Sequence, residues 1–181
     1  MINIRDIKTD PAGQPDQHDL AAITAIYRHH VLNGTASFEI EPPSSSEMAT
    51  RMAQLLAGGY PILVAMHHNT LCGCAYAGPH KPRAAYNQTV EHSVYVSDDQ
   101  RGNGIGRQLL AQLIEAAAAR GHYQMMAVIG DSDNTASIGL HRALGFRHIG
   151  TAQEIGFKFG RRLDIVYMQR ALQSAPQSGS T

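Results

Sequence analysis

Apolar residues along the chain alternate between the spacing of helices and the spacing of strands. From Leu20 to Val31 they recur every three or four residues, which predicts an amphipathic helix. Ser44 and Glu47 stand at the spacing of a capping box, so a second helix is expected to begin there and to stop at Gly58. The remaining predicted elements are helices at 104–120 and 135–144 and strands at 2–5, 61–66, 71–77, 89–96, 125–129, 148–159 and 163–168.

Turn residues separate these elements and set the fold class. The pair His68-Asn69 is typical of a hairpin turn, and Gly121 and Gly145 are expected to end the two later helices. Helices and strands mixed along 181 residues predict one α/β domain around a central sheet. The segment 173–181 is rich in Ser, Gln, Pro and Gly and is predicted to be a disordered tail.

Composition narrows the classes of function. The formal net charge is zero, which argues against a nucleic-acid partner or an acidic membrane surface. No apolar run approaches the length that spans a bilayer, and the first residues lack the basic and apolar regions of a signal peptide. Ten histidines are present, but no HExxH or closed ligand cluster appears, so no metal is predicted.

The two cysteines, Cys72 and Cys74, lie one residue apart. In a strand they would point to the same face, and they are too close in sequence for an ordinary disulfide. We expect two reduced thiols in or near the core of a cytoplasmic protein. A metal-binding pair is the alternative, although structural zinc usually takes four ligands and no second pair follows.

The strongest chemical signal is a glycine-rich loop between a predicted strand and the helix at 104–120. Glycine lets backbone N–H groups converge on phosphate oxygens, the helix N-terminus adds unpaired donors, and arginines can add charge-assisted contacts. Neither a P-loop nor a dinucleotide fingerprint fits the spacing. A turn that only connects strand to helix is the alternative. The loop consists of Arg101, Gly102, Asn103, Gly104, Ile105, Gly106 and Arg107.

Two motifs resemble the GNAT family of acetyl-CoA-dependent N-acetyltransferases. The first, Arg101-x-x-Gly104-x-Gly106, is similar to the loop that holds the pyrophosphate of coenzyme A in that family. The second lies about thirty residues later and pairs with the first, which makes the resemblance more specific. It reads Asn134-x-x-Ser137-x-x-x-His141-x-x-x-Gly145-Phe146.

Further segments are similar to the phosphinothricin and methionine sulfoximine N-acetyltransferase branch of the family. They lie at 60–65, 89–96, 137–141 and 156–161. The resemblance implies a single GNAT domain over 1–172, with a mixed, mostly antiparallel central sheet flanked by helices. Two departures are Arg162, where relatives often carry Trp, and the cysteines that flank Gly73.

The resemblance implies roles for the strand at 89–96. Glu91 is the implied general base, which takes a proton from the attacking amine. In this fold the strand splays from its neighbour after the glutamate, so the main chain of Val94, Tyr95 and Val96 is implied to pair with the pantetheine arm of acetyl-CoA. From the residues alone, Glu91 could equally be an exposed strand residue.

Residues of the second motif have two interpretations each. His141 occupies the place where many relatives carry the tyrosine that protonates the coenzyme A thiolate, and a histidine that only packs or hydrogen-bonds is the alternative. Asn134 and Ser137 contact the cofactor in one interpretation and cap the helix at 135–144 in the other.

The resemblance also implies where the acceptor amine binds. Arg83 is a candidate to hold an α-carboxylate, or else a solvated loop residue. Members of this branch are typically dimeric, which implies a homodimer with Lys158 and Phe159 near its interface. The implied acceptor residues are Phe38, Tyr76, Ala77, Gly78, Arg83, Tyr86, Thr89, Val90 and Glu91.

The predicted activity is transfer of an acetyl group from acetyl-CoA to the α-amine of a small amino-acid-like compound. Phosphinothricin, methionine sulfoximine and methionine sulfone are the implied types. Two alternatives stay open: another acceptor, such as a protein N-terminus, a polyamine or an antibiotic, and a non-catalytic sensor that binds coenzyme A.

Overall fold

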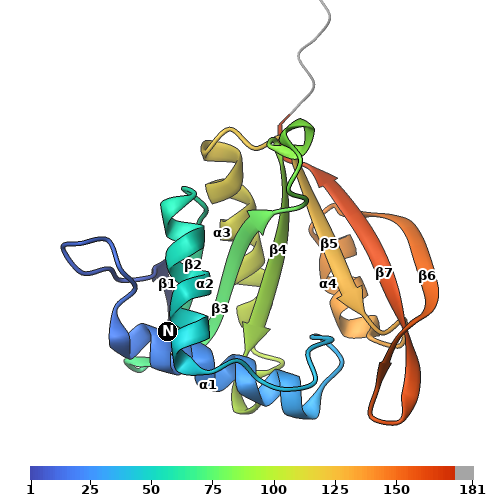
Figure 1. The fold of residues 1–181 in the computed structure, drawn as a ribbon, viewed down its shortest axis with the longest axis horizontal. Helices are drawn as coiled ribbons and strands as arrows, with labels where there is room; N and C mark the ends of the chain where they lie inside the picture. Colours follow the sequence, from blue (N-terminus) through green and yellow to red (C-terminus); the bar gives the residue numbers. More distant parts are fainter. Residues whose placement is uncertain (174–181) are drawn as a thin grey trace, which may run out of the picture.

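The computed structural model describes residues 1–173, which form one seven-stranded sheet with helices on both faces (Figure 1). The strand order is β1-β2-β3-β4-β5-β7-β6, and β4 and β5 are a parallel pair among antiparallel neighbours. The predicted mixed, mostly antiparallel sheet is confirmed. The strands are β1 (Ile2–Asp6), β2 (Ile62–His67), β3 (Thr70–Pro79), β4 (Thr89–Val96), β5 (Gln124–Gly130), β6 (Arg147–Lys158) and β7 (Arg161–Ala171).

The predicted helices are also present. The capping box of Ser44 and Glu47 is confirmed, and Gly121 and Gly145 have the positive φ expected where helices end. The first helix begins earlier than its apolar stripe because the Asp16 carboxylate caps it. The α-helices are α1 (Gln17–Asn33), α2 (Ser45–Ala57), α3 (Ile105–Ala119) and α4 (Thr135–Ala143), and two short 3-10 turns, Ala84–Tyr86 and Asp98–Gln100, are additional.

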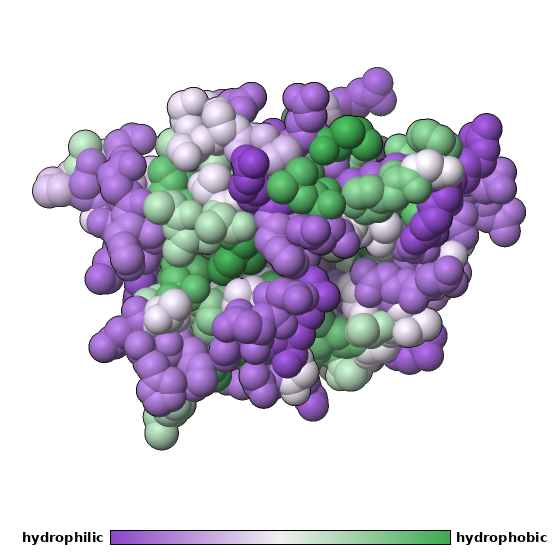
Figure 2. Space-filling view, turned by 90° about the horizontal axis from the view of Figure 1, so that it is seen from below, coloured by the Kyte–Doolittle hydropathy of each residue, from purple (hydrophilic) through white to green (hydrophobic). Residues whose placement is uncertain are grey.

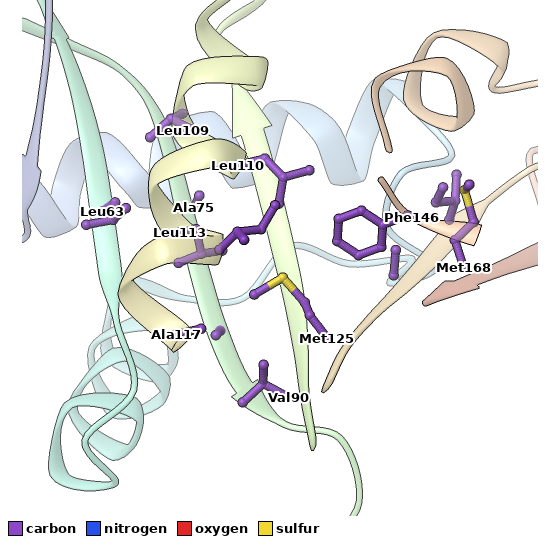
Figure 3. Packing of buried hydrophobic residues seen from close by; sticks show 14 of the residues in the cluster. Leu63, Ala75, Val90, Leu109, Leu110, Leu113, Ala117, Met125, Phe146 and Met168 are labelled. Carbon is purple, nitrogen blue, oxygen red and sulfur yellow. The ribbon is translucent and has the colours of Figure 1, made fainter. Parts of the chain in front are cut away.

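Two apolar cores lie on opposite faces of the sheet. Helices α1 and α2 cover one face, where Ile23 and Met52 are buried. On the other face, Leu109 and Leu113 of α3 belong to one buried cluster with Val90 and Met125, and Leu113 lies beside Met125 in Figure 3. The α3 core continues past Phe146 to Met168, and α4 residues pack against it. The strands of the sheet centre are thus held from both sides.

The cysteines face opposite sides of the sheet, so the prediction of a shared face is wrong. The β2–β3 register shifts between Ala65 and Met66, which makes Cys72 an extra residue in β3. Cys72 therefore packs in the α3 core and Cys74 in the core under α1 and α2. Both thiols are free and buried, as predicted, and burial raises the pKa of Cys74 to about 12.

The predicted disordered tail at 173–181 lies, beyond Gln173, outside the described residues. Within residues 1–173, none of the helices has the length and apolar character needed to cross a membrane.

Candidate active site

The central feature of the site is a gap between β4 and β5. Strand β4 pairs with β3 from Val90 to Val96, but with β5 only from Thr89 to Glu91. Strand β5 turns instead along β7, and the two parallel strands diverge visibly in Figure 1. Beyond Glu91, one edge of β4 therefore has no neighbouring strand, which is the splay that the family resemblance implied.

The main chain of β4 alternates between its partner β3 and this open edge. The Ser97 N–H donates to the Cys72 carbonyl at 2.8 Å, which fixes the parity of the antiparallel ladder. By this parity Tyr95 directs its main-chain groups toward β3, while Val94 and Val96 direct theirs toward the gap. The Val96 carbonyl already accepts a hydrogen bond from His30 Nε2 at 2.9 Å. The main chain of Val94 and the N–H of Val96 remain open to a ligand.

The glycine-rich loop at the end of β4 presents a row of unpaired donors. Gly102 and Gly104 have φ angles of 79° and 73°, which side-chain-bearing residues rarely adopt. Within residues 1–173, no main-chain or side-chain acceptor takes the N–H of any residue from 102 to 107. Such consecutive N–H groups at a helix N-terminus form an anion-binding concavity.

The two arginines of the loop are exposed. Arg101 pairs with Asp98 at 3.0 Å, so a phosphate group would compete with that carboxylate for its guanidinium. Arg107 stands in the first turn of α3 and makes no ion pair within the described chain. Both are available to add positive charge beside the N–H row.

Glu91 lies where the β4–β5 pairing ends. Its side chain is 39% exposed and accepts a hydrogen bond from His80 Nδ1 at 3.0 Å. His80 follows the last residue of β3, and the sequence pattern places it only within the loop at 78–86. The β3–β4 register, in which Gly78 lies opposite Glu91, brings His80 diagonally across from the carboxylate. Register is invisible in the sequence, so this contact was not predicted.

His141 forms a buried pair with His92, which the sequence did not predict either. The two rings stack with centroids 5.0 Å apart, and their Nε2 atoms are 3.1 Å apart. His141 Nδ1 lies 2.7 Å from the Ser137 carbonyl, which can only accept, so Nδ1 carries the proton. The His141 Nε2 must then accept from the His92 Nε2–H.

This arrangement holds both histidines neutral. Burial lowers the pKa of His92 to about 3 and also lowers the pKa of His141. The His92 Nδ1 is left as a buried acceptor without a partner in the described residues. In this geometry both nitrogens of His141 are engaged, and neither holds a proton directed elsewhere.

Phe38, in the α1–α2 connection, fits into a slot lined by two glycines. A Cβ on Gly156 of β6 would lie 2.2 Å from its ring, and a Cβ on Gly130 of β5 would lie 2.8 Å from it. The buried Lys158 ammonium fixes the same segment by donating to the carbonyls of Gly34 and Ser37 at 2.9 and 2.6 Å. The Lys158 side chain therefore points into its own protomer.

The other predicted acceptor residues differ in what they can offer. Tyr76 packs against Tyr95, and burial raises its pKa. Ala77 and Val90 are buried in the α3 core, so they can shape the site only from within. Arg83 is exposed and makes no ion pair within the described residues. The remaining ones, Gly78, Tyr86 and Thr89, are half-buried near the β3–β4 connection.

Asn134 caps α4: its side chain accepts the N–H of Ser137 at 3.2 Å. The capping interpretation thus describes what Asn134 does in this structure, and its carboxamide nitrogen is left for other contacts. Within residues 1–173, no group of three His, Cys, Asp or Glu side chains is arranged to hold a metal ion.

The site combines three features: two parallel strands that diverge, a row of unpaired N–H groups at a helix N-terminus, and a carboxylate where the strands part. This combination is the arrangement expected of an acetyltransferase. Residues 14–167 match the acetyltransferase (GNAT) domain, and the chain belongs to this family. It is an acetyltransferase by fold and by relationship. The fold class, family and enzyme class predicted from the sequence are confirmed.

Two relatives and one solved structure show which acetyltransferases this chain is similar to. The chain is 51% identical to a phosphinothricin N-acetyltransferase of Alcaligenes faecalis over 86% of its own length and 79% of the relative's. It is 48% identical to an L-methionine sulfoximine/L-methionine sulfone acetyltransferase of Pseudomonas paraeruginosa, over 87% and 94% of the two chains. A crystal structure of a Sinorhizobium meliloti phosphinothricin acetyltransferase in complex with AcCoA superposes with a TM-score of 0.87, at 43% identity and coverage of 98% and 94%.

Proposed function

We propose that this enzyme transfers an acetyl group from acetyl-CoA to the α-amine of a small amino-acid-like acceptor. Phosphinothricin, methionine sulfoximine and methionine sulfone are the proposed acceptor types. The observation that carries the acetyl-CoA assignment is the row of unpaired N–H groups at 102–107 beside the open edge of β4. The names of the relatives support the acceptor type.

The layout supports a defined path for the cosubstrate. The N–H groups of the loop would hold its diphosphate, with Arg101 and Arg107 adding charge, and Val94 and Val96 would pair with the amides of the pantetheine arm. From Val96 back to Glu91 the strand runs roughly 17 Å at 3.3 Å per residue. That length suits an extended pantetheine arm, so the thioester would arrive close to the carboxylate.

In the proposed mechanism, bound acetyl-CoA supplies the thioester and Glu91 accepts the proton that the amine loses as it attacks. Glu91 is partly exposed and lies at the fork, so an amine can approach it from solvent. Phe38 and Tyr76 would line the acceptor side, and Arg83 would take the acceptor's carboxylate. Asn134 and Ser137 are proposed cofactor neighbours at the start of α4.

The test is a thiol-release assay with acetyl-CoA and a panel of phosphinothricin, methionine sulfoximine, methionine sulfone and common amino acids. We expect turnover with the first three. Glu91→Gln should retain acetyl-CoA binding and lower kcat about 100-fold or more, the usual contribution of a general base. Unchanged turnover would remove Glu91 from the mechanism, and acetyl-CoA binding with no turnover for any amine would favour a sensor.

Two roles of His141 stay open as predictions: it donates a proton to the coenzyme A thiolate, or it only packs in the core. As a donor it would first have to exchange its contacts with Ser137 and His92. His141→Phe retains an aromatic ring against Phe146. A large fall in kcat at an unchanged melting temperature would support the donor role.

We propose further that the protein is a homodimer that pairs through the edge strand β6. Four large apolar side chains on β6 and the turn that follows it are exposed, and Figure 2 shows several separate apolar patches among polar side chains on the face seen from below. Light scattering should give twice the mass of one chain, 19.6 kDa. Phe157→Lys should halve that mass, whereas Leu32→Lys on α1 should not. The exposed residues are Ile149, Ile155, Phe157 and Phe159.

A cytoplasmic location is also proposed, and two buried free thiols support it because reducing compartments preserve them. Fractionation of cells that express the protein would test this proposal.

A further inference from the structure

The carboxylate at the fork of β4 and β5 has one side-chain partner in the described chain. His80 Nδ1 lies 3.0 Å from Glu91 Oε2, and a carboxylate can only accept, so the imidazole donates its Nδ1–H. This bond occupies one oxygen of Glu91 and leaves Oε1 without a donor among residues 1–173. The pair is therefore asymmetric: one oxygen is held and the other is open.

His80 is itself held in place. Its side chain is 14% exposed, its backbone N–H points to the Thr89 carbonyl at 3.4 Å, and its ring forms a T-shaped pair with the Tyr86 ring, with centroids 5.9 Å apart. Glu91, by contrast, is 39% exposed, and without a donor its terminal torsion would be broad. An anchored donor on a mobile carboxylate restricts the direction in which the second oxygen points.

We infer that His80 is a positioning residue for the general base, and this inference rests on the proposed function. By holding Oε2, the His80 Nδ1–H aims Oε1 of Glu91 at the amine. His80 does not touch the reacting atoms, so its effect on turnover must pass through Glu91.

Three substitutions of His80 test whether turnover depends on a hydrogen-bond donor at the position of Nδ1 or only on the presence of a side chain. In His80→Asn the carboxamide nitrogen can occupy the place of Nδ1, whereas in His80→Gln it reaches the place of Nε2 and in His80→Ala no donor is left. We expect kcat to fall about 10- to 100-fold in His80→Ala and His80→Gln, the usual range for loss of a hydrogen bond to a charged group. His80→Asn should retain kcat within about threefold, and the KM for acetyl-CoA should not change in any of them.

A double-mutant cycle with Glu91→Gln tests whether His80 acts through the carboxylate. In the Glu91→Gln background, His80→Ala should cause no further loss of kcat. An equal loss in both backgrounds, or wild-type kcat in both His80→Ala and His80→Gln, would overturn the inference. If Glu91→Gln turns over normally, Glu91 is not the base and the proposed function loses its mechanism. If Glu91→Gln is slow but His80→Ala has wild-type kcat, only the positioning role of His80 is overturned. Far-ultraviolet circular dichroism and acetyl-CoA titration of each variant check folding, and His80→Gln serves if His80→Ala does not fold.

Discussion

Gly156→Ala tests the slot that holds Phe38. A Cβ at this position would lie 2.2 Å from Phe38 Cε2 and 2.6 Å from Cδ2, well inside the distance of an ordinary carbon contact. The ring must therefore move by more than an ångström. Because Phe38 is only half-buried, it can swing outward, and the cost is that of overpacking, about 1–3 kcal/mol. For a chain of this size the melting temperature should fall by about 2–12 °C.

The same substitution should change catalysis selectively. If Phe38 lines the acceptor side, its displacement should raise the KM for the amine about tenfold, the effect of losing part of an aromatic contact. Acetyl-CoA binding should be unchanged, because the N–H row at 102–107 and the edge of β4 are not altered. Calorimetric melting and steady-state kinetics with methionine sulfone as the varied substrate measure the two effects separately.

Two other glycines complete the experiment. Gly150 lies on the same strand, and a Cβ added to it would meet no atom within 4 Å, so Gly150→Ala should be neutral within about 1 kcal/mol. Gly130→Ala should be worse than Gly156→Ala, since its Cβ would lie 2.1 Å from the main-chain oxygen of Thr35, which cannot swing away. A melting temperature for Gly156→Ala equal to that of Gly150→Ala would refute the slot. A lower melting temperature with an unchanged amine KM would refute the acceptor role of Phe38.

Three further predictions test the loop, the buried lysine and the histidine pair. Gly104→Val places a side chain at φ 73°, at a cost of about 1–2 kcal/mol, and should abolish the acetyl-CoA binding that calorimetry measures. Gly13→Val is the control: it meets similar strain at φ 77° outside the loop and should bind acetyl-CoA normally. Lys158→Met removes the two hydrogen bonds from the Lys158 ammonium to the carbonyls of Gly34 and Ser37. The melting temperature should fall by several degrees and the KM for the amine should rise, while the affinity for acetyl-CoA should not change. His92 and His141 have pKa values below the unfolded value of 6.5, so their stabilising effect is complete above pH 6.5 and is lost as pH falls toward 3. Between pH 6.5 and about 4.5 the melting temperature of His92→Ser should therefore fall less steeply than that of the wild type, and parallel curves would contradict the neutral pair.

The sequence alone determined the helices, the strands, the glycine-rich loop and the family, because these follow from rules that act between neighbouring residues. The apolar spacing predicted the helices and strands, the Ser44–Glu47 box marked the start of α2, and the glycines at 102 and 104 marked a loop in which N–H groups converge. The family followed from the same loop and the Asn134–Phe146 motif. These features were readable because capping, turn geometry and periodicity act over a few residues.

Only the tertiary structure decided how side chains distant in sequence meet. Strict alternation placed Cys72 and Cys74 on one face, but a bulge, set by how β2 packs on β3, separated them. The pairing of His80 with Glu91 depends on strand register, and that of His92 with His141 on how α4 docks against β4. Register and docking arise from the packing of the whole core, so no short stretch of sequence contains them.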